Sequence, residues 1–211
     1  MIKNNFICMK DLKQYINEGF KLSKDYKKPF NYYPKTIGEL DALVQKLIKE
    51  RGNEANLNDI DTSQIDNMQF LFTGLKFDGD ISGWDVSNVK DMNAMFYRST
   101  YTGKNGGISK WDVSNVIDMS SMFAKSNFDG DISNWNVHKV IYMSSMFDSS
   151  VFDGDLSNWD VSSVESMNRM FRESKFTGKN GDISGWNVKP KCLTKDIFTE
   201  CELKIKKPDW V

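Results

Sequence analysis

The sequence predicts an α/β solenoid, in which coils of the chain stack on one another and each coil holds one short strand and one short helix. The first observation is a stretch at 79–96, GDISGWDVSNVKDMNAMF, that recurs lightly edited at 106–123, 130–147 and 154–171. The second is that units of 24 or 27 residues each end in tryptophan: Trp84, Trp111, Trp135, Trp159, Trp186 and Trp210. A period of this length is typical of a solenoid, because one unit alone cannot bury its apolar face.

The third observation is the apolar spacing inside each unit. Residues three or four apart predict a short helix that faces inward, as Val89, Met92 and Phe96 do in the unit that begins at Asp85. The D-I-S segment before each tryptophan predicts a short strand whose central residue, such as Ile81, points inward. We expect these strands to pair in parallel at about 4.8 Å per coil. The six coils would occupy residues 57–211, with the more polar last coil as a C-terminal cap.

Residues 36–56 predict a helix and a lead-in that cover the first coil. Thr36 is the expected N-cap and Glu39 completes a capping box, while Gly52 is the expected stop. One face of this helix is apolar, through Ile37, Leu40, Val44, Leu47 and Ile48. Residues 1–35 predict a further short helix at 9–22 and an aromatic connector with Tyr26, Phe30, Tyr32 and Tyr33. These aromatic rings either pin the first helix over the stack or anchor a partner protein.

Charge and cysteine content limit the function classes. The net charge is −1, but residues 61–186 hold 11 basic against 17 acidic side chains. An acidic body argues against direct nucleic-acid binding and favours a basic protein partner. The three cysteines, Cys8, Cys192 and Cys201, have no metal-ligand spacing, which suggests a reducing compartment. With no signal peptide, lipobox or membrane-spanning run in the sequence, we expect a cytoplasmic protein that does not enter a membrane.

The candidate binding residues are the exposed positions that the repeat leaves free. An acidic row beside the predicted strands is formed by Asp80, Asp131, Asp155 and Asp182, next to a variable column that includes Lys110, Asn134 and Asn158. Two inserts with the sequence T-G-K-N-G lengthen two units and carry Lys104 and Lys179; they are either plain length variation or a pair of basic contacts. Tyr32 and Tyr33 of the connector complete the predicted partner surface.

No residue set predicts catalysis. The single histidine, His138, stands at a repeat position usually held by serine, and no nucleophile–base pair or phosphate loop can be assembled. Asp-Gly-Asp corners such as Asp78 to Asp80 carry the oxygen ligands that calcium uses, but they equally suit turn hydrogen bonds. We therefore predict a protein that is not an enzyme and that needs no cofactor, with calcium left open.

The unit F-[DN]-G-D-I-S-x-W-[DN]-V-S-x-V-x-x-M-x-x-M-F resembles the repeat of the BspA-like leucine-rich-repeat family, which also occurs in mycoplasma lipoproteins. The resemblance covers about residues 57–210. It implies a right-handed, leucine-rich-repeat-like solenoid, with a parallel sheet on one face and short helical segments on the other. Members of that family are mostly surface-exposed and often adhesive.

Together these features predict a protein–protein interaction module that binds its partner through the solenoid surface. One alternative is an inhibitor, encoded by a phage or mobile element, that occludes a host defence or nucleic-acid enzyme. Another is a surface adhesin without its export signal. Self-association is also compatible with the exposed strand edges.

Overall fold

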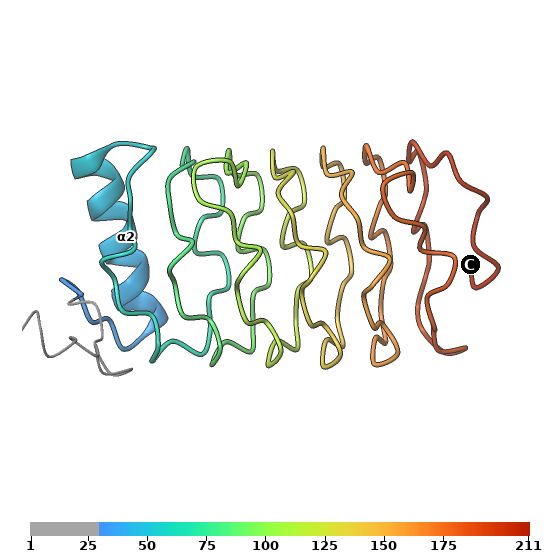
Figure 1. Cartoon of the computed structure of the whole chain (residues 1–211), viewed down its shortest axis with the longest axis horizontal. Coiled ribbons are helices and arrows are strands. Elements are labelled where there is room, and N and C mark those ends of the chain that lie inside the picture. Colours follow the sequence, from blue (N-terminus) through green and yellow to red (C-terminus); the bar gives the residue numbers. More distant parts are fainter. Residues whose placement is uncertain (1–29) are drawn as a thin grey trace, which may run out of the picture.

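The computed structural model describes residues 30–211, so the predicted helix at 9–22 and the connector residue Tyr26 lie outside the described residues. Helix α2 spans Ile37–Arg51 and lies at one end of the molecule (Figure 1). The Thr36 hydroxyl accepts the Glu39 N–H at 3.2 Å, and the Glu39 carboxylate accepts the Lys35 N–H at 2.7 Å. This confirms the predicted N-cap, although the Glu39 carboxylate binds one residue before the position that a capping box requires.

The apolar face of α2 closes the end of the core. Leu40, Val44 and Leu47 have no exposed surface and belong to the same buried cluster as the coils. Ile37 and Ile48 are half-buried at the edge of that cluster. The helix ends at Arg51, and the Gly52 N–H donates to the Ile48 carbonyl at 2.9 Å. The positive φ of Gly52, 90°, lets the following chain leave the helix. The predicted helix is therefore confirmed within one residue at its start.

After α2 the chain forms a row of similar coils that lie side by side along the long axis (Figure 1). The predicted α/β class is wrong. Within residues 30–211, α2 is the only helix, and parallel pairing is limited to isolated bridges rather than strands of a sheet. The segments predicted as a short helix in each coil are turns instead, and the D-I-S segments are irregular chain that leads into a turn at the serine.

Neighbouring coils are joined by a row of four backbone hydrogen bonds that point the same way. Met92, Ala94, Phe96 and Arg98 each donate their N–H to a carbonyl of the next coil at 2.9–3.0 Å. The equivalent residues of the other coils repeat this pattern at 2.7–3.0 Å up to the last coil. The parallel bridges run along the start of this row, through Asn67, Asp91, Asp118, Tyr142, Ser166 and Leu193. Pairing thus occurs where the short helix was predicted, whereas the D-I-S column has a bridge only between Asn56 and Asp80.

Backbone handedness explains why the segment is neither helix nor strand. In the second coil, Ala94 and Arg98 hold φ at 51° and 55°, in the left-handed region, and every coil has two such residues four apart. Regular helices and strands need negative φ at every residue. In this segment every second N–H donates to the next coil, while the N–H groups between them, such as that of Met95, donate to a carbonyl three residues back in their own coil.

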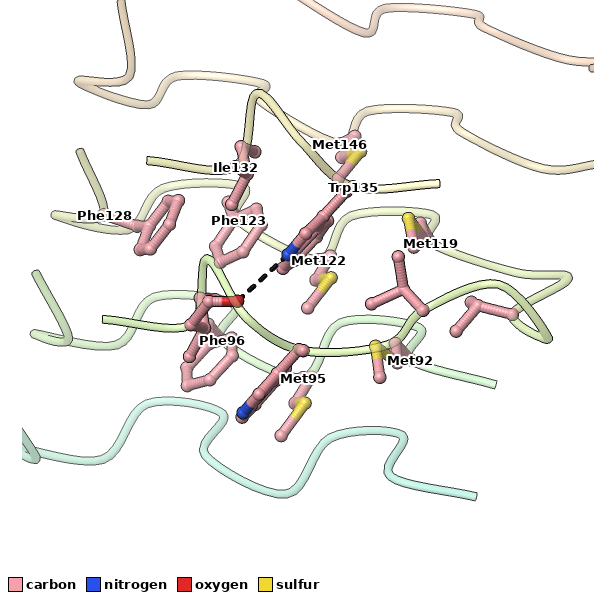
Figure 2. Packing of buried hydrophobic residues seen from close by; sticks show 14 of the residues in the cluster. Met92, Met95, Phe96, Met119, Met122, Phe123, Phe128, Ile132, Trp135 and Met146 are labelled. Carbon is pink, nitrogen blue, oxygen red and sulfur yellow. Dashed lines mark hydrogen bonds between the residues drawn. The ribbon is translucent and has the colours of Figure 1, made fainter. Parts of the chain in front are cut away.

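The inward columns predicted from spacing are confirmed. Val89, Met92, Met95 and Phe96 have no exposed surface, and the same holds for the equivalent residues of the next three coils. Figure 2 shows several of these side chains packed together. Phe96 stacks on Phe72 and Phe123 with centroid distances of 5.3 and 5.6 Å. The aromatic rings of neighbouring coils therefore stack directly on one another in the core.

The phased tryptophans have a polar role as well as an apolar one. Trp135 is 3% exposed, and its indole N–H donates to the Ile108 carbonyl of the preceding coil at 3.0 Å (Figure 2). This carbonyl belongs to the D-I-S segment, which lacks a strand partner. Every other tryptophan makes the same bond to the coil before it: Trp84 to Leu57, Trp111 to Ile81, Trp159 to Ile132, Trp186 to Leu156 and Trp210 to Ile183. The indole therefore replaces the sheet hydrogen bond at this edge.

Candidate binding surfaces

The predicted acidic row consists of turn-forming aspartates. Asp131 accepts the Ser133 N–H at 2.9 Å and the Ser133 hydroxyl at 2.7 Å. These two bonds hold the pKa of Asp131 below its usual range. Asp155 and Asp182 each accept the N–H of the serine two residues on at 2.8 Å. The row was expected to point away from strands; it shapes turns through one carboxylate oxygen of each residue.

The row is not one continuous surface. Asp131 and Asp182 are exposed, whereas Asp80 and Asp155 are half-buried. The two inserts cause this difference, because each lies over the aspartate of the preceding coil. A Cβ built at Gly106 would lie 2.2 Å from the Asp80 carboxylate oxygen. A Cβ at Gly181 would meet the Asp155 carboxylate in the same way. The second glycine of each insert is therefore needed for close approach.

The inserts are fastened to the coil before them. The Thr102 hydroxyl and N–H both donate to the Asp78 carboxylate at 2.8 Å, and Asn105 donates to the Asp78 carbonyl at 2.8 Å. Thr177 and Asn180 make the same contacts with Asp153. These bonds use Asp78 and Asp153 as inter-coil clamps. Lys104 and Lys179 remain exposed at the loop tips.

The connector aromatics divide into a structural and an exposed residue. Tyr32 forms a parallel bridge with Ile60, and its ring lies 5.8 Å from the Arg51 guanidinium carbon. Tyr33 is 60% exposed and packs edge-on against Phe30. Tyr32 therefore packs on the end of the stack, whereas Tyr33 is exposed. The choice between pinning the helix at 9–22 and anchoring a partner stays a prediction, because that helix lies outside the described residues.

A cavity of about 860 Å³ lies beside α2. Its wall combines aspartates, amides and hydroxyls of the lead-in and first two coils with the ring of Phe30: Asn56, Asn58, Asp59, Asp61, Ser63, Asp80, Ser82, Gly83 and Asp85. Arg51 pairs with Asp59 through two bonds of 2.9 Å, which lower the pKa of that carboxyl. Of the predicted row, only Asp80 reaches this cavity. The repeated D-x-S turns of consecutive units were the sequence signal for this acidic cavity. Only the tertiary structure shows that residues of the lead-in and of two units line the same cavity.

A second surface was missed by the sequence reasoning. Tyr142 and Leu193, which are 43% and 57% exposed, stand in a column that elsewhere holds Asn, Asp or Ser. They line a groove of about 490 Å³ together with Val164, Glu165, Ser166, Lys189, Lys191 and Cys192. A comparison of the residues at this repeat position in all coils would have revealed these two exposed apolar side chains from the sequence. The predicted column of Lys110, Asn134 and Asn158 is exposed but lies in neither hollow.

The remaining reactive side chains have structural surroundings. Burial raises the pKa of the Cys192 and Cys201 thiols, which lowers their thiolate content at neutral pH. Cys201 occupies the small-residue column and donates to the Phe176 carbonyl at 3.2 Å. In the part of the chain from Phe30 onward, no three histidine, cysteine or acidic side chains are placed to hold a metal ion.

Family comparison gives the chain a place among known sequences. The model of the family described as "Mycoplasma protein of unknown function, DUF285" matches residues 42–102 and 98–210. The chain belongs to this family. This match supports the predicted resemblance to repeat proteins of mycoplasmas. No curated protein and no solved structure matches this DUF285 chain.

Among the residues described for this DUF285 chain, no helix is long and apolar enough to cross a membrane. The cytoplasmic location stays a prediction from the sequence.

Proposed function

We propose that the protein is a binding module without catalytic activity, and that it holds a partner protein by basic side chains in the acidic cavity beside α2. The observation that carries this proposal is the cavity itself: about 860 Å³ of open space lined by four aspartates, with the ring of Phe30 at its wall. A hollow of this size accepts a lysine or arginine side chain together with its neighbours in a peptide.

Two of the four carboxylates keep one oxygen free for a ligand. Asp61 and Asp85 each accept a serine N–H through Oδ1, at 3.0 Å in both cases. Their Oδ2 atoms have no hydrogen-bond partner within residues 30–211. Asp59 is already paired with Arg51, so a basic ligand would meet Asp61 and Asp85 first. A guanidinium is the best match, because its planar donors fit carboxylates.

The predicted alternatives use the same kind of contact. An occluding inhibitor and a surface adhesin would each present this surface to a protein, and they differ in the partner. We also propose that the protein is related to the BspA-like leucine-rich-repeat family, and the repeat motif supports this relationship.

The test measures binding of a fluorescent peptide that alternates arginine with tyrosine, with a glutamate-for-arginine peptide as the reference. We expect Asp61→Asn combined with Asp85→Asn to weaken binding of the arginine peptide about tenfold or more, since exposed and half-buried charge contacts at an interface contribute on that scale. Asp131→Asn combined with Asp182→Asn is the matched control, because it removes two exposed carboxylates that lie outside the cavity and likewise accept a serine N–H. Equal binding by the cavity variant and the control would refute the proposed site.

A further inference from the structure

The last coil ends in four backbone donors without acceptors. In every inner coil a row of four N–H groups donates to the next coil. In the last coil the equivalent groups belong to Thr194, Asp196, Phe198 and Glu200. None of these N–H groups donates a hydrogen bond within residues 30–211, although Leu193, Lys195, Ile197 and Thr199 accept from the coil before. The last coil therefore has these carbonyl groups paired with the preceding coil, while its four N–H groups on the opposite side are unpaired within the described residues.

The surface around these donors is open and partly apolar. Phe198 is half-buried, whereas Phe171 and the four preceding members of its column have no exposed surface. A cavity of about 510 Å³ borders the row and is lined by Thr194, Asp196, Ile197, Phe198, Thr199, Lys207 and Val211. This face lies at the opposite end of the stack from α2 and its acidic cavity (Figure 1). Unpaired rows of this kind are templates for a further chain.

We propose that this face binds a segment of a second polypeptide that carries the same coil motif, M-x-x-M-F, and adds it as one more coil. The inner interfaces specify the occupant. In each inner interface, the accepting coil offers the carbonyls of every second residue, and all of them point toward the donors. The accepting coil also contains two residues with positive φ. A β-strand edge presents both N–H and C=O groups, so part of its donors would face the donors of this row.

Side-chain packing specifies the same occupant. Phe198 stacks on Phe171 at 5.6 Å, so an aromatic residue of the added coil would stack on Phe198 in turn. The aliphatic positions of the motif would cover Ile197, as the methionines of one inner coil cover those of the next (Figure 2). The first coil of another copy is a poorer source of such a segment, because α2 already packs its apolar face over that end.

The experiment uses the whole chain and a labelled synthetic peptide with the sequence of residues 112–135. Amide hydrogen exchange is expected to be fast at Asp196, Phe198 and Glu200 in the free chain and to slow on peptide binding. The equivalent amides of Arg169, Phe171 and Glu173 are protected in both states. A peptide with Met122→Ser and Phe123→Ser is the matched control and is expected not to protect.

Substitution of one donor gives a second readout by fluorescence anisotropy. Thr194→Pro removes one N–H of the row, and the extended bridge at Leu193 tolerates a following proline. We expect peptide binding to weaken about threefold to tenfold relative to Thr194→Ala, which keeps the N–H. The proposal is overturned if the peptide leaves exchange at these amides unchanged, if the control peptide protects them equally, or if Thr194→Pro binds like Thr194→Ala. It is also overturned if the free chain already protects them as an oligomer in light scattering, since a second copy would then be the occupant.

Discussion

Replacing Lys125 by glycine is expected to stabilise the protein, although it removes a side chain and adds no contact. Lys125 holds φ at 56°, and its N–H donates to the Asp148 carbonyl at 2.8 Å. Its side chain is exposed and makes no ion pair with any residue from 30 to 211. The lysine therefore contributes little beyond occupying a left-handed position that glycine occupies without cost.

The magnitude follows from two opposing terms. A left-handed conformation costs an L-residue about 1–2 kcal/mol, and glycine is free of this cost. Glycine loses about 0.5–1 kcal/mol more backbone entropy when the chain folds. The net gain is about 0.5–1 kcal/mol, which for a chain of this length raises Tm by about 1–4 °C.

Differential scanning calorimetry on three variants tests this reasoning. Lys125→Ala is the matched control, because it removes the same side chain but keeps the Cβ. Gly74→Ala is the reverse change in the same column: Gly74 has φ of 67°, and an added Cβ would meet no atom within 4 Å. It should therefore be destabilised by backbone strain alone. A Lys125→Gly variant that melts at or below Lys125→Ala would refute the argument that these positions carry conformational strain.

Three further outcomes test other contacts of the coil. Trp135→Phe should lower the free energy of unfolding in urea by about 0.5–1.5 kcal/mol, because one buried hydrogen bond is lost while the Ile108 carbonyl still accepts the Trp111 N–H at 3.1 Å; the half-buried Trp210→Phe is the control and should lose less. Thr102→Val should speed amide exchange in the first insert while leaving the second insert, fastened by Thr177, unchanged; slower or equal exchange would contradict the clamp. Burial, and then the nearby carboxylates of Asp78 and Asp80, raise the pKa of Tyr101. Its contribution is therefore complete below the unfolded pKa of about 10 and is lost as pH rises above that value. Tyr101→Phe should reduce the loss of stability between pH 9 and 11, and an unchanged slope would argue against this cause.

The repeat period and the inward columns could be predicted from the sequence. Apolar residues are excluded from water wherever the backbone turns, so the spacing of Val89, Met92 and Phe96 identified the core without the correct secondary structure. The start and end of α2 were also readable, because Thr36 and Gly52 act through local bonds.

The secondary structure of the coil could not be read in the same way. Spacing of three and four residues predicts a helix only if the backbone bonds to itself, and here alternate N–H groups bond to the next coil. The sequence marks only one of these left-handed positions with glycine, at Gly74. At the others, such as Ala94 and Lys125, inter-coil hydrogen bonds and ring stacking outweigh the local preference.

The candidate surfaces show the same division. The sequence by itself determined which positions are free of the core, including Asp80, Asp131 and Tyr33. Only the tertiary structure decided that an insert covers Asp80 and that Asp61 and Asp85 share its cavity. It likewise placed Tyr142 and Leu193 along one groove. These decisions depend on how one coil sits on another, and residues about 24 apart meet through contacts that no local pattern records.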